Sequence, residues 1–96
     1  CYGLTFKPDI DDLRESPAMQ IVEALAYKNI GKLLVVEPNV SELPKRLMVE
    51  NIELASLGRA IDEASIVILL VDHKSFKAIN KIDLAIKVVI DTKGIL

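Results

Sequence analysis

The sequence predicts a single α/β domain in which a parallel sheet of about five strands lies between two layers of helices. Apolar segments of strand length alternate along the chain with segments of helical periodicity, which is typical of parallel strands joined by right-handed crossovers. Residues 33–36 and 66–71 are unbroken apolar runs, as expected for strands covered on both faces. Polar residues follow these runs directly, at the carboxyl edge of the predicted sheet.

The first half of the chain is predicted to contain two strands with a helix between them. Residues 1–6 are expected to form strand one. Ser16 and Pro17 start the helix, because a serine side chain can accept hydrogen bonds from the free N–H groups of the first turn and proline has no N–H to lose. The helix is expected to stop at residues 29–31, before a strand at 33–36. Apolar residues at helical spacing predict its buried face: Ala18, Ile21, Val22 and Leu25.

The second half of the chain continues the alternation with shorter elements. The expected elements are a short helix over about 41–49, an edge strand at 52–55, a helix at 57–64, a strand at 66–71, a short helix at 75–79 and a last strand at 88–90. Ser56 and Ser75 are plausible caps for the second and third of these helices. By composition, the strand at 66–71 is predicted to be the most buried.

Composition sets limits on the class of protein. The chain has 96 residues, of which 51% are hydrophobic and 27% charged, so it is expected to fold around one core. Its formal net charge of −2 argues against a general nucleic-acid-binding protein. The single cysteine excludes an internal disulfide and gives no metal-site spacing. With no membrane-length apolar run and no signal-peptide pattern, we expect a cytoplasmic protein. The chain begins inside a strand-like run without Met, so we expect it to be a fragment of a longer protein.

The candidate site lies at the carboxyl ends of the predicted strands. The polar residues that follow strands are Lys7, Glu37, Asp72, His73, Lys74, Asp91, Thr92 and Lys93. Five basic or potentially basic residues, including one in the loop after strand one, indicate an anionic ligand: Lys7, Arg14, His73, Lys74 and Lys93. With a strand order of 3-2-1-4-5, the loops carrying Lys7 and His73 flank one crevice. Polar residues end the strands of any α/β domain, so the alternative of an exposed or purely structural His73 remains open.

Two other interpretations of the loops are weaker. Glu37 lies where a Rossmann dinucleotide fold places its ribose-binding acid, but Gly3 stands alone and no G-x-G-x-x-G follows strand one. We therefore predict a Rossmann-like domain that is not an NAD site by itself, with Glu37 as an ordinary strand-end acid.

Asp11 and Asp12, with Lys93, resemble the acidic pair and lysine of a receiver domain. The strand at 52–55 lacks the following aspartate that a receiver needs as phosphoacceptor, and the acidic pair is more simply explained as ordering its own loop than as binding a metal.

The sequence resembles one enzyme family in four segments. Residues 3–18 read G-L-T-F-K-P-D-I-D-D-L-R-E-S-P-A, residues 35–39 read V-V-E-P-N, residues 70–77 read L-V-D-H-K-S-F-K and residues 89–94 read V-I-D-T-K-G. Together they are similar to the carboxyl-terminal domain of the UDP-glucose/GDP-mannose dehydrogenase family. The segments at 35–39, 70–77 and 89–94 most resemble the branch that acts on UDP-N-acetyl-D-mannosamine, because Lys93 stands where many UDP-glucose dehydrogenases have arginine.

The resemblance implies a function for the longer protein. Such enzymes oxidise the sugar C6 hydroxyl to a carboxylate in two hydride transfers to NAD, for polysaccharide biosynthesis. It implies that residues 1–96 are the UDP-sugar-binding domain, that the catalytic cysteine and most of the NAD site lie in missing amino-terminal and central domains, and that the full-length enzyme is a homodimer. Cys1 has no catalytic role, and the fragment alone is expected to be inactive. UDP-glucose and UDP-N-acetylglucosamine remain alternative substrates.

The resemblance also assigns roles to single residues. Phe6 and Lys7 align with positions that contact the UDP-sugar, and Lys93 aligns with a basic substrate contact. Arg14 aligns with an arginine that reaches across the cleft to NAD bound by the other domain. His73 is a possible cleft residue. No residue of the chain is expected to be catalytic or to bind a metal.

Overall fold

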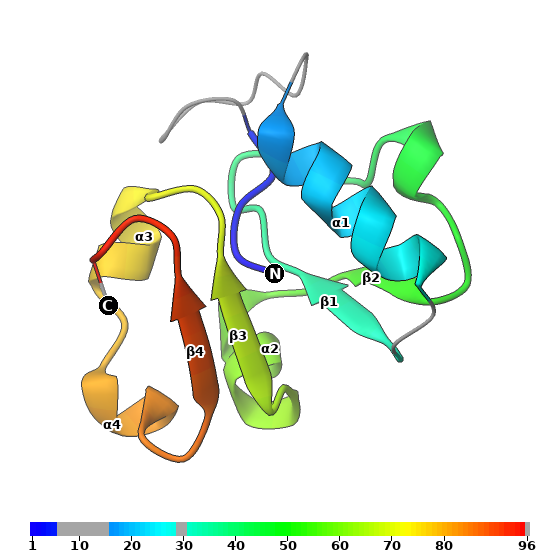
Figure 1. Ribbon diagram of the computed structural model, residues 1–96. Coiled ribbons are helices and arrows are strands. Elements are labelled where there is room, and N and C mark those ends of the chain that lie inside the picture. The colour runs from blue at the N-terminus through cyan, green and yellow to red at the C-terminus, as the bar shows by residue number, and fades with distance from the viewer. Residues whose placement is uncertain (6–15, 29–30, 96) are drawn as a thin grey trace.

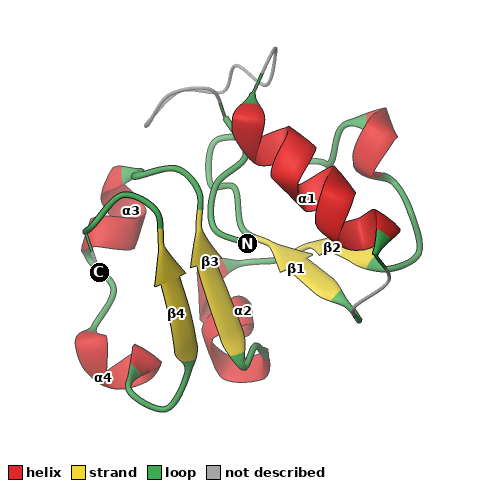
Figure 2. Cartoon of the chain, viewed as in Figure 1, coloured by secondary structure: helices red, strands yellow, loops and turns green. Residues whose placement is uncertain are grey.

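The computed structural model describes residues 1–5, 16–28 and 31–95, in which helices alternate with parallel strands (Figure 1). Within these residues the elements are α1 (Pro17–Tyr27), β1 (Leu33–Val35), the 3-10 helix η1 (Lys45–Leu47), β2 (Ile52–Leu54), α2 (Leu57–Glu63), β3 (Ile66–Leu69), α3 (Lys74–Lys77), α4 (Lys81–Leu84) and β4 (Val88–Asp91). Figure 2 shows the same view with helices, strands and loops in different colours. The predicted α/β fold class is confirmed.

Tyr2 joins two pairs of strands into one parallel arrangement. β1 pairs with β2 and β3 pairs with β4, both in parallel. Tyr2 forms parallel bridges to Val36 and Leu69, and its N–H donates to the Ile68 carbonyl at 2.8 Å. The spatial order is therefore β2, β1, Tyr2, β3, β4, which is the 3-2-1-4-5 order on which the predicted crevice depended.

Strand one is much shorter than the predicted residues 1–6. Gly3 has a φ of +99°, outside the extended range, so the regular ladder ends after Tyr2. A Cβ atom built on Gly3 would lie 2.6 Å from the Val71 Cβ and 2.9 Å from the Val71 nitrogen. The chain can therefore turn and pass this close to Val71 only with glycine at this position.

The core consists of two hydrophobic clusters, as expected for a sheet between two helical layers. The buried residues around α1 are Leu4, Ala18, Met19, Val22, Leu33, Val35, Leu47, Ile52, Leu70 and Val71. Those of the second cluster, which includes α2 and α3, are Tyr2, Val36, Ala60, Val67, Leu69, Phe76 and Leu84. The predicted buried face of α1 was partly wrong, because Ile21 is exposed and Met19 is buried in its place. Met19 turns its flexible side chain into the cluster around Val22.

β3 is not the fully covered strand that its composition predicted. Ile66 is 56% exposed, and Val88 and Ile90 of the neighbouring β4 are also exposed. The register pairs Ile66 with Val88 and Ile68 with Ile90, so these side chains share one face of the sheet. α1 lies over β1 and β2, whereas α2 lies behind β3 in this view (Figure 1). The face of β3 and β4 on the α1 side is therefore open among the described residues.

Two of the short helices differ from the sequence prediction. The helix expected over 41–49 is a single turn, η1, in which Leu47 is buried, whereas Met48 and Val49 after it are exposed. α3 begins at Lys74 rather than after Ser75, since the first-turn N–H of Phe76 bonds the His73 carbonyl. α4 was not predicted. No helix in the described part of the chain combines the length and the apolar character needed to span a membrane.

Candidate ligand site

The carboxyl edge of the sheet brings together residues that are far apart in the sequence. Thr5 follows the Tyr2 bridge, Glu37 follows β1, Asp72 and His73 follow β3, and Lys93 follows β4. All five lie in loops at the same edge because every strand pair is parallel. The sequence predicted this placement for Glu37, Asp72, His73 and Lys93, whereas Thr5 was expected inside strand one.

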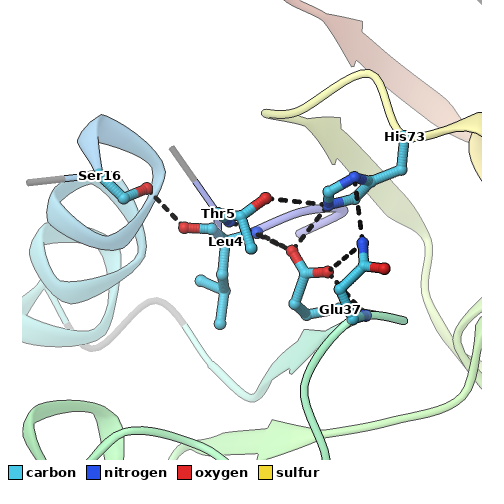
Figure 3. Close-up of polar contacts among 6 residues, drawn as sticks. Leu4, Thr5, Ser16, Glu37 and His73 are labelled. Atoms are coloured by element: carbon cyan, nitrogen blue, oxygen red, sulfur yellow. Dashed lines mark hydrogen bonds and ion pairs between the residues drawn. The ribbon is translucent and has the colours of Figure 1, made fainter. Parts of the chain in front are cut away.

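A buried carboxylate holds the main chain at the centre of this edge. Oε1 of Glu37 accepts hydrogen bonds from the N–H of Leu4 at 2.8 Å and of Thr5 at 3.2 Å. The same oxygen lies 2.8 Å from Nε2 of His73. Glu37 is 3% exposed and His73 is 1% exposed. Figure 3 shows the carboxylate pointing from the loop after β1 toward Leu4, Thr5 and the imidazole.

Asn39 completes the shell around this pair. Its main-chain N–H donates to Oε2 of Glu37 at 3.0 Å, and its side-chain nitrogen lies 3.3 Å from the same oxygen. That nitrogen is also 3.3 Å from Nδ1 of His73. Both carboxylate oxygens thus receive donors, which offsets the cost of burying the charge. Phe76 packs beneath the imidazole, with 5.4 Å between ring centroids.

Ser16 holds the same segment from the other side. Its hydroxyl donates to the carbonyl of Leu4 (Figure 3). The prediction that this side chain would accept from the first turn of α1 was wrong, since it makes no capping hydrogen bond. Leu4 is fully buried, and its carbonyl needs a donor in a place where water has little access. The hydrogen bond between Ser16 and Leu4 therefore joins the chain just before the segment 6–15 to the chain just after it.

A small cavity opens beside Thr5, between the end of β3 and the start of α1. Its volume is about 90 Å³, and the residues that line it are Thr5, Pro17, Ala18, Leu70, Val71, Asp72 and Lys93. Oδ1 of Asp91 accepts from the N–H of Lys93 at 2.9 Å and of Gly94 at 2.7 Å, and this turn sets the main chain at Lys93. The Thr92 hydroxyl donates to the carbonyl of Leu69 at 2.6 Å and fastens the turn to β3.

The whole chain, residues 1–96, matches the UDP binding domain of the UDP-glucose/GDP-mannose dehydrogenase family. The chain belongs to this family. The resemblance inferred from the four sequence segments is thereby confirmed.

Individual members of the family are identical to this chain at about half of the aligned positions. It is 50% identical over 95 residues to the UDP-N-acetyl-D-mannosamine dehydrogenases of Yersinia pestis and Escherichia coli K12, which covers 99% of this chain. It is 48% identical over 94 residues to an NDP-N-acetyl-D-galactosaminuronic acid dehydrogenase of Ralstonia solanacearum. The chain spans only 22% of the length of each of these relatives.

A solved structure shares the fold of this domain. The UDP-N-acetyl-mannosamine dehydrogenase of Staphylococcus aureus superposes with a TM-score of 0.74 at 32% identity. The match covers 99% of this chain and 22% of that one. The matched region is therefore about a fifth of the Staphylococcus aureus enzyme.

The structure places two of the five predicted site residues of this family domain. Lys93 lines the cavity beside Thr5, and His73 is buried against Glu37 at the same edge. Phe6, Lys7 and Arg14 lie outside the described residues, as do Asp11 and Asp12. Among residues 1–5, 16–28 and 31–95, no three His, Cys, Asp or Glu side chains are grouped so that they could hold a metal ion.

Sequence reasoning missed the importance of Glu37 and Asn39. Glu37 was interpreted as an ordinary strand-end acid, which is wrong, because it is buried and binds the main chain of a neighbouring strand end. One signal was present in the sequence. Glu37 follows one apolar strand, and His73, the only histidine of the sequence, comes soon after another. Because parallel strands end at the same edge of a sheet, the two side chains could have been expected to meet there.

Proposed function

We propose that this chain is the nucleotide-sugar-binding domain of a UDP-N-acetyl-D-mannosamine 6-dehydrogenase that uses NAD. The single observation that carries the proposal is the match of the whole chain to the family's UDP binding domain, with relatives at 50% identity that are named for UDP-N-acetyl-D-mannosamine. In this proposal the longer enzyme oxidises C6 of the sugar to the uronic acid in two steps. The catalytic and central parts lie in the rest of that enzyme.

The geometry of the carboxyl edge supports a role in binding an anionic ligand. Lys93 and Thr5 line a cavity at the junction of Tyr2 and β3, where the strand order reverses direction. We propose that Phe6, Lys7 and Lys93 bind the UDP-sugar, with the lysines paired to the diphosphate as point charges. His73 supports this edge from beneath, through Glu37 and Thr5.

The described residues do not form an NAD site by themselves. The main chain next to strand one has Gly3 alone, without the further glycines that let a dinucleotide pyrophosphate approach. Glu37, which would otherwise meet a ribose, already has both oxygens occupied by hydrogen-bond donors within the domain. We therefore propose that NAD is held mainly by the amino-terminal domain of the longer enzyme, with Arg14 reaching toward it across the cleft.

Two measurements test this function. Isothermal titration of UDP into the 96-residue chain should show binding, while the chain alone should reduce no NAD with any UDP-sugar. The full-length enzyme should oxidise UDP-N-acetylmannosamine in preference to UDP-glucose, UDP-N-acetylglucosamine and UDP-N-acetylgalactosamine. The last of these is included because a relative at 48% identity is named for the galactosamine series. Preference for any other sugar would replace the mannosamine assignment, and turnover by the fragment would contradict the division of roles.

A further inference from the structure

We infer that Glu37 and His73 are positioning residues for the nucleotide-sugar site, because their buried pair fixes the main chain of Leu4 and Thr5 from which that site is built. The inference rests on the proposed function. It adds that substrate affinity depends on residues that do not themselves touch the substrate.

The hydrogen bonds of Glu37 are aimed at one short stretch of main chain. Oε1 receives the N–H groups of Leu4 and Thr5 together with Nε2 of His73. An oxygen that takes three donors at 2.8–3.2 Å is well suited to a carboxylate and poorly replaced by a neutral amide. The imidazole also reaches the Thr5 hydroxyl, with 3.2 Å between Nε2 and Oγ1. Thr5 is thus held through both its main chain and its side chain.

Thr5, the residue that Glu37 and His73 hold in place, lies at the proposed ligand site. Thr5 lines the cavity that Lys93 also lines, and it is covalently followed by Phe6 and Lys7. A displacement of the Thr5 main chain would therefore move the wall of the cavity that Lys93 also lines. An error of about 1 Å in positioning is enough to impair a binding or catalytic site severely.

Stability alone is a poor explanation for this pair. Burying a carboxylate and an imidazole costs desolvation free energy, and apolar residues of similar size often stabilise a core as well or better. What the pair supplies, and what an apolar pair could not, is a set of directed bonds to two consecutive N–H groups. Such directed bonds are what a preorganised site requires.

The test uses the full-length enzyme and compares four variants. Glu37→Gln removes the negative charge, and His73→Leu removes the imidazole. His73→Gln also removes the imidazole but supplies an amide nitrogen that can donate a hydrogen bond in place of Nε2. Glu23→Gln is the matched control, because Glu23 is an exposed carboxylate that pairs with Arg46. Apparent KM for UDP-N-acetylmannosamine, apparent KM for NAD, kcat and melting temperature are measured for each.

The expected result is a split between the two substrates. Glu37→Gln and His73→Leu should raise the KM for the UDP-sugar about tenfold, the size expected when a hydrogen bond to a charged group is lost, and should change the KM for NAD less than twofold. His73→Gln should recover most of the loss, and Glu23→Gln should behave as wild type. Equal increases in both KM values, or a lower melting temperature with unchanged KM values, would overturn the positioning role.

A milder variant covers the case in which Glu37→Gln does not fold. Asn39→Ala removes only the outer hydrogen bonds to Oε2 of Glu37 and to Nδ1 of His73. It should raise the KM for the UDP-sugar in the same direction by a smaller factor, and an unchanged KM would count against the inference. Failure of the proposed function looks different: the wild-type enzyme would then oxidise no UDP-sugar, and the wild-type chain would bind no UDP.

Discussion

The carboxylate of Glu37 and the imidazole of His73 are 36 positions apart in the chain, yet Oε1 and Nε2 lie 2.8 Å apart in the interior. Asn39 reaches both partners, since its side-chain nitrogen is 3.3 Å from Oε2 of Glu37 and 3.3 Å from Nδ1 of His73. The amide nitrogen can only donate, so Nδ1 must accept. The geometry therefore assigns the Nε2–H tautomer to His73, with its proton directed at Glu37.

This tautomer can be measured directly because His73 is the only histidine in the chain. In the 96-residue protein at neutral pH, ¹⁵N shifts of the imidazole should show a protonated Nε2 and an unprotonated Nδ1. Asn39→Asp would replace the donor with an acceptor and should shift the population toward a protonated Nδ1. Asn80→Asp, at the exposed cap of α4, serves as the control. A wild-type spectrum with protonated Nδ1 would contradict the assigned network.

Substitutions at Ser16 can distinguish a hydroxyl that donates a hydrogen bond from one that accepts as a helix cap. At an ordinary N-cap, aspartate replaces serine without loss. Here the hydroxyl donates to the Leu4 carbonyl and is 2% exposed, so Ser16→Asp brings a buried charge against an acceptor. We expect Ser16→Asp to lower the free energy of unfolding by about 2–4 kcal/mol, more than Ser16→Ala. Urea denaturation checks this, with Ser56→Asp at the conventional cap of α2 as a nearly neutral control.

Gly3 is expected to tolerate no side chain. Its φ of +99° is strained for any other residue, and a Cβ would lie 2.9 Å from the main-chain nitrogen of Val71. Gly3→Ala should therefore lower the free energy of unfolding by roughly 2–4 kcal/mol, from backbone strain and from the displaced neighbour. Gly58→Ala, in α2 with open space around it, should be neutral or slightly stabilising. A loss at Gly3 no larger than the change at Gly58 would contradict the close approach.

The ion pairs of Glu53 predict a specific pH dependence. Hydrogen bonds from Arg59 and then Lys32 lower the pKa of this carboxyl from 4.5 to about 2. A carboxyl whose pKa is depressed in the folded state contributes stability above its unfolded pKa. That contribution is lost as the pH falls from about 4.5 to about 2. An NMR titration should find the depressed value in the wild type and a value closer to 4.5 in Arg59→Met. An unchanged titration in Arg59→Met would show that the pairing has no such effect.

The two basic residues of the segment after strand one should differ in the substrate they affect. If Lys7 binds the diphosphate, Lys7→Ala in the full-length enzyme should weaken use of the UDP-sugar by roughly 2–4 kcal/mol, the loss of a charge-assisted bond in a desolvated cleft. Arg14→Ala should instead raise the apparent KM for NAD far more than that for the sugar. Steady-state kinetics with melting temperatures decide the matter. Equal effects of Arg14→Ala on both KM values, with a lower melting temperature, would mean that Arg14 merely orders its loop.

Local patterns in the sequence predicted most of the element types correctly. The apolar runs at 33–36 and 66–71 became β1 and β3, and Ser56 caps α2 as its position suggested. The 3-2-1-4-5 strand order was only a condition of the site argument, and the strand pairing in the structure established it. Errors occurred where packing overrode local preference. Gly3 cut strand one short, and the helix predicted over 41–49 is only the single turn η1.

The sequence by itself determined the α/β alternation, the parallel sheet and the edge at which polar residues gather, because these depend on hydrophobic periodicity and on chain connectivity. Only the tertiary structure decided that Ser16 donates to Leu4 instead of capping α1, and that Glu37 is buried against His73. These contacts join loops from different strands, and no local pattern specifies which donor a buried acceptor will meet. The choice is made when packing excludes water, since each buried polar group must then be satisfied by the partner that the fold brings within reach.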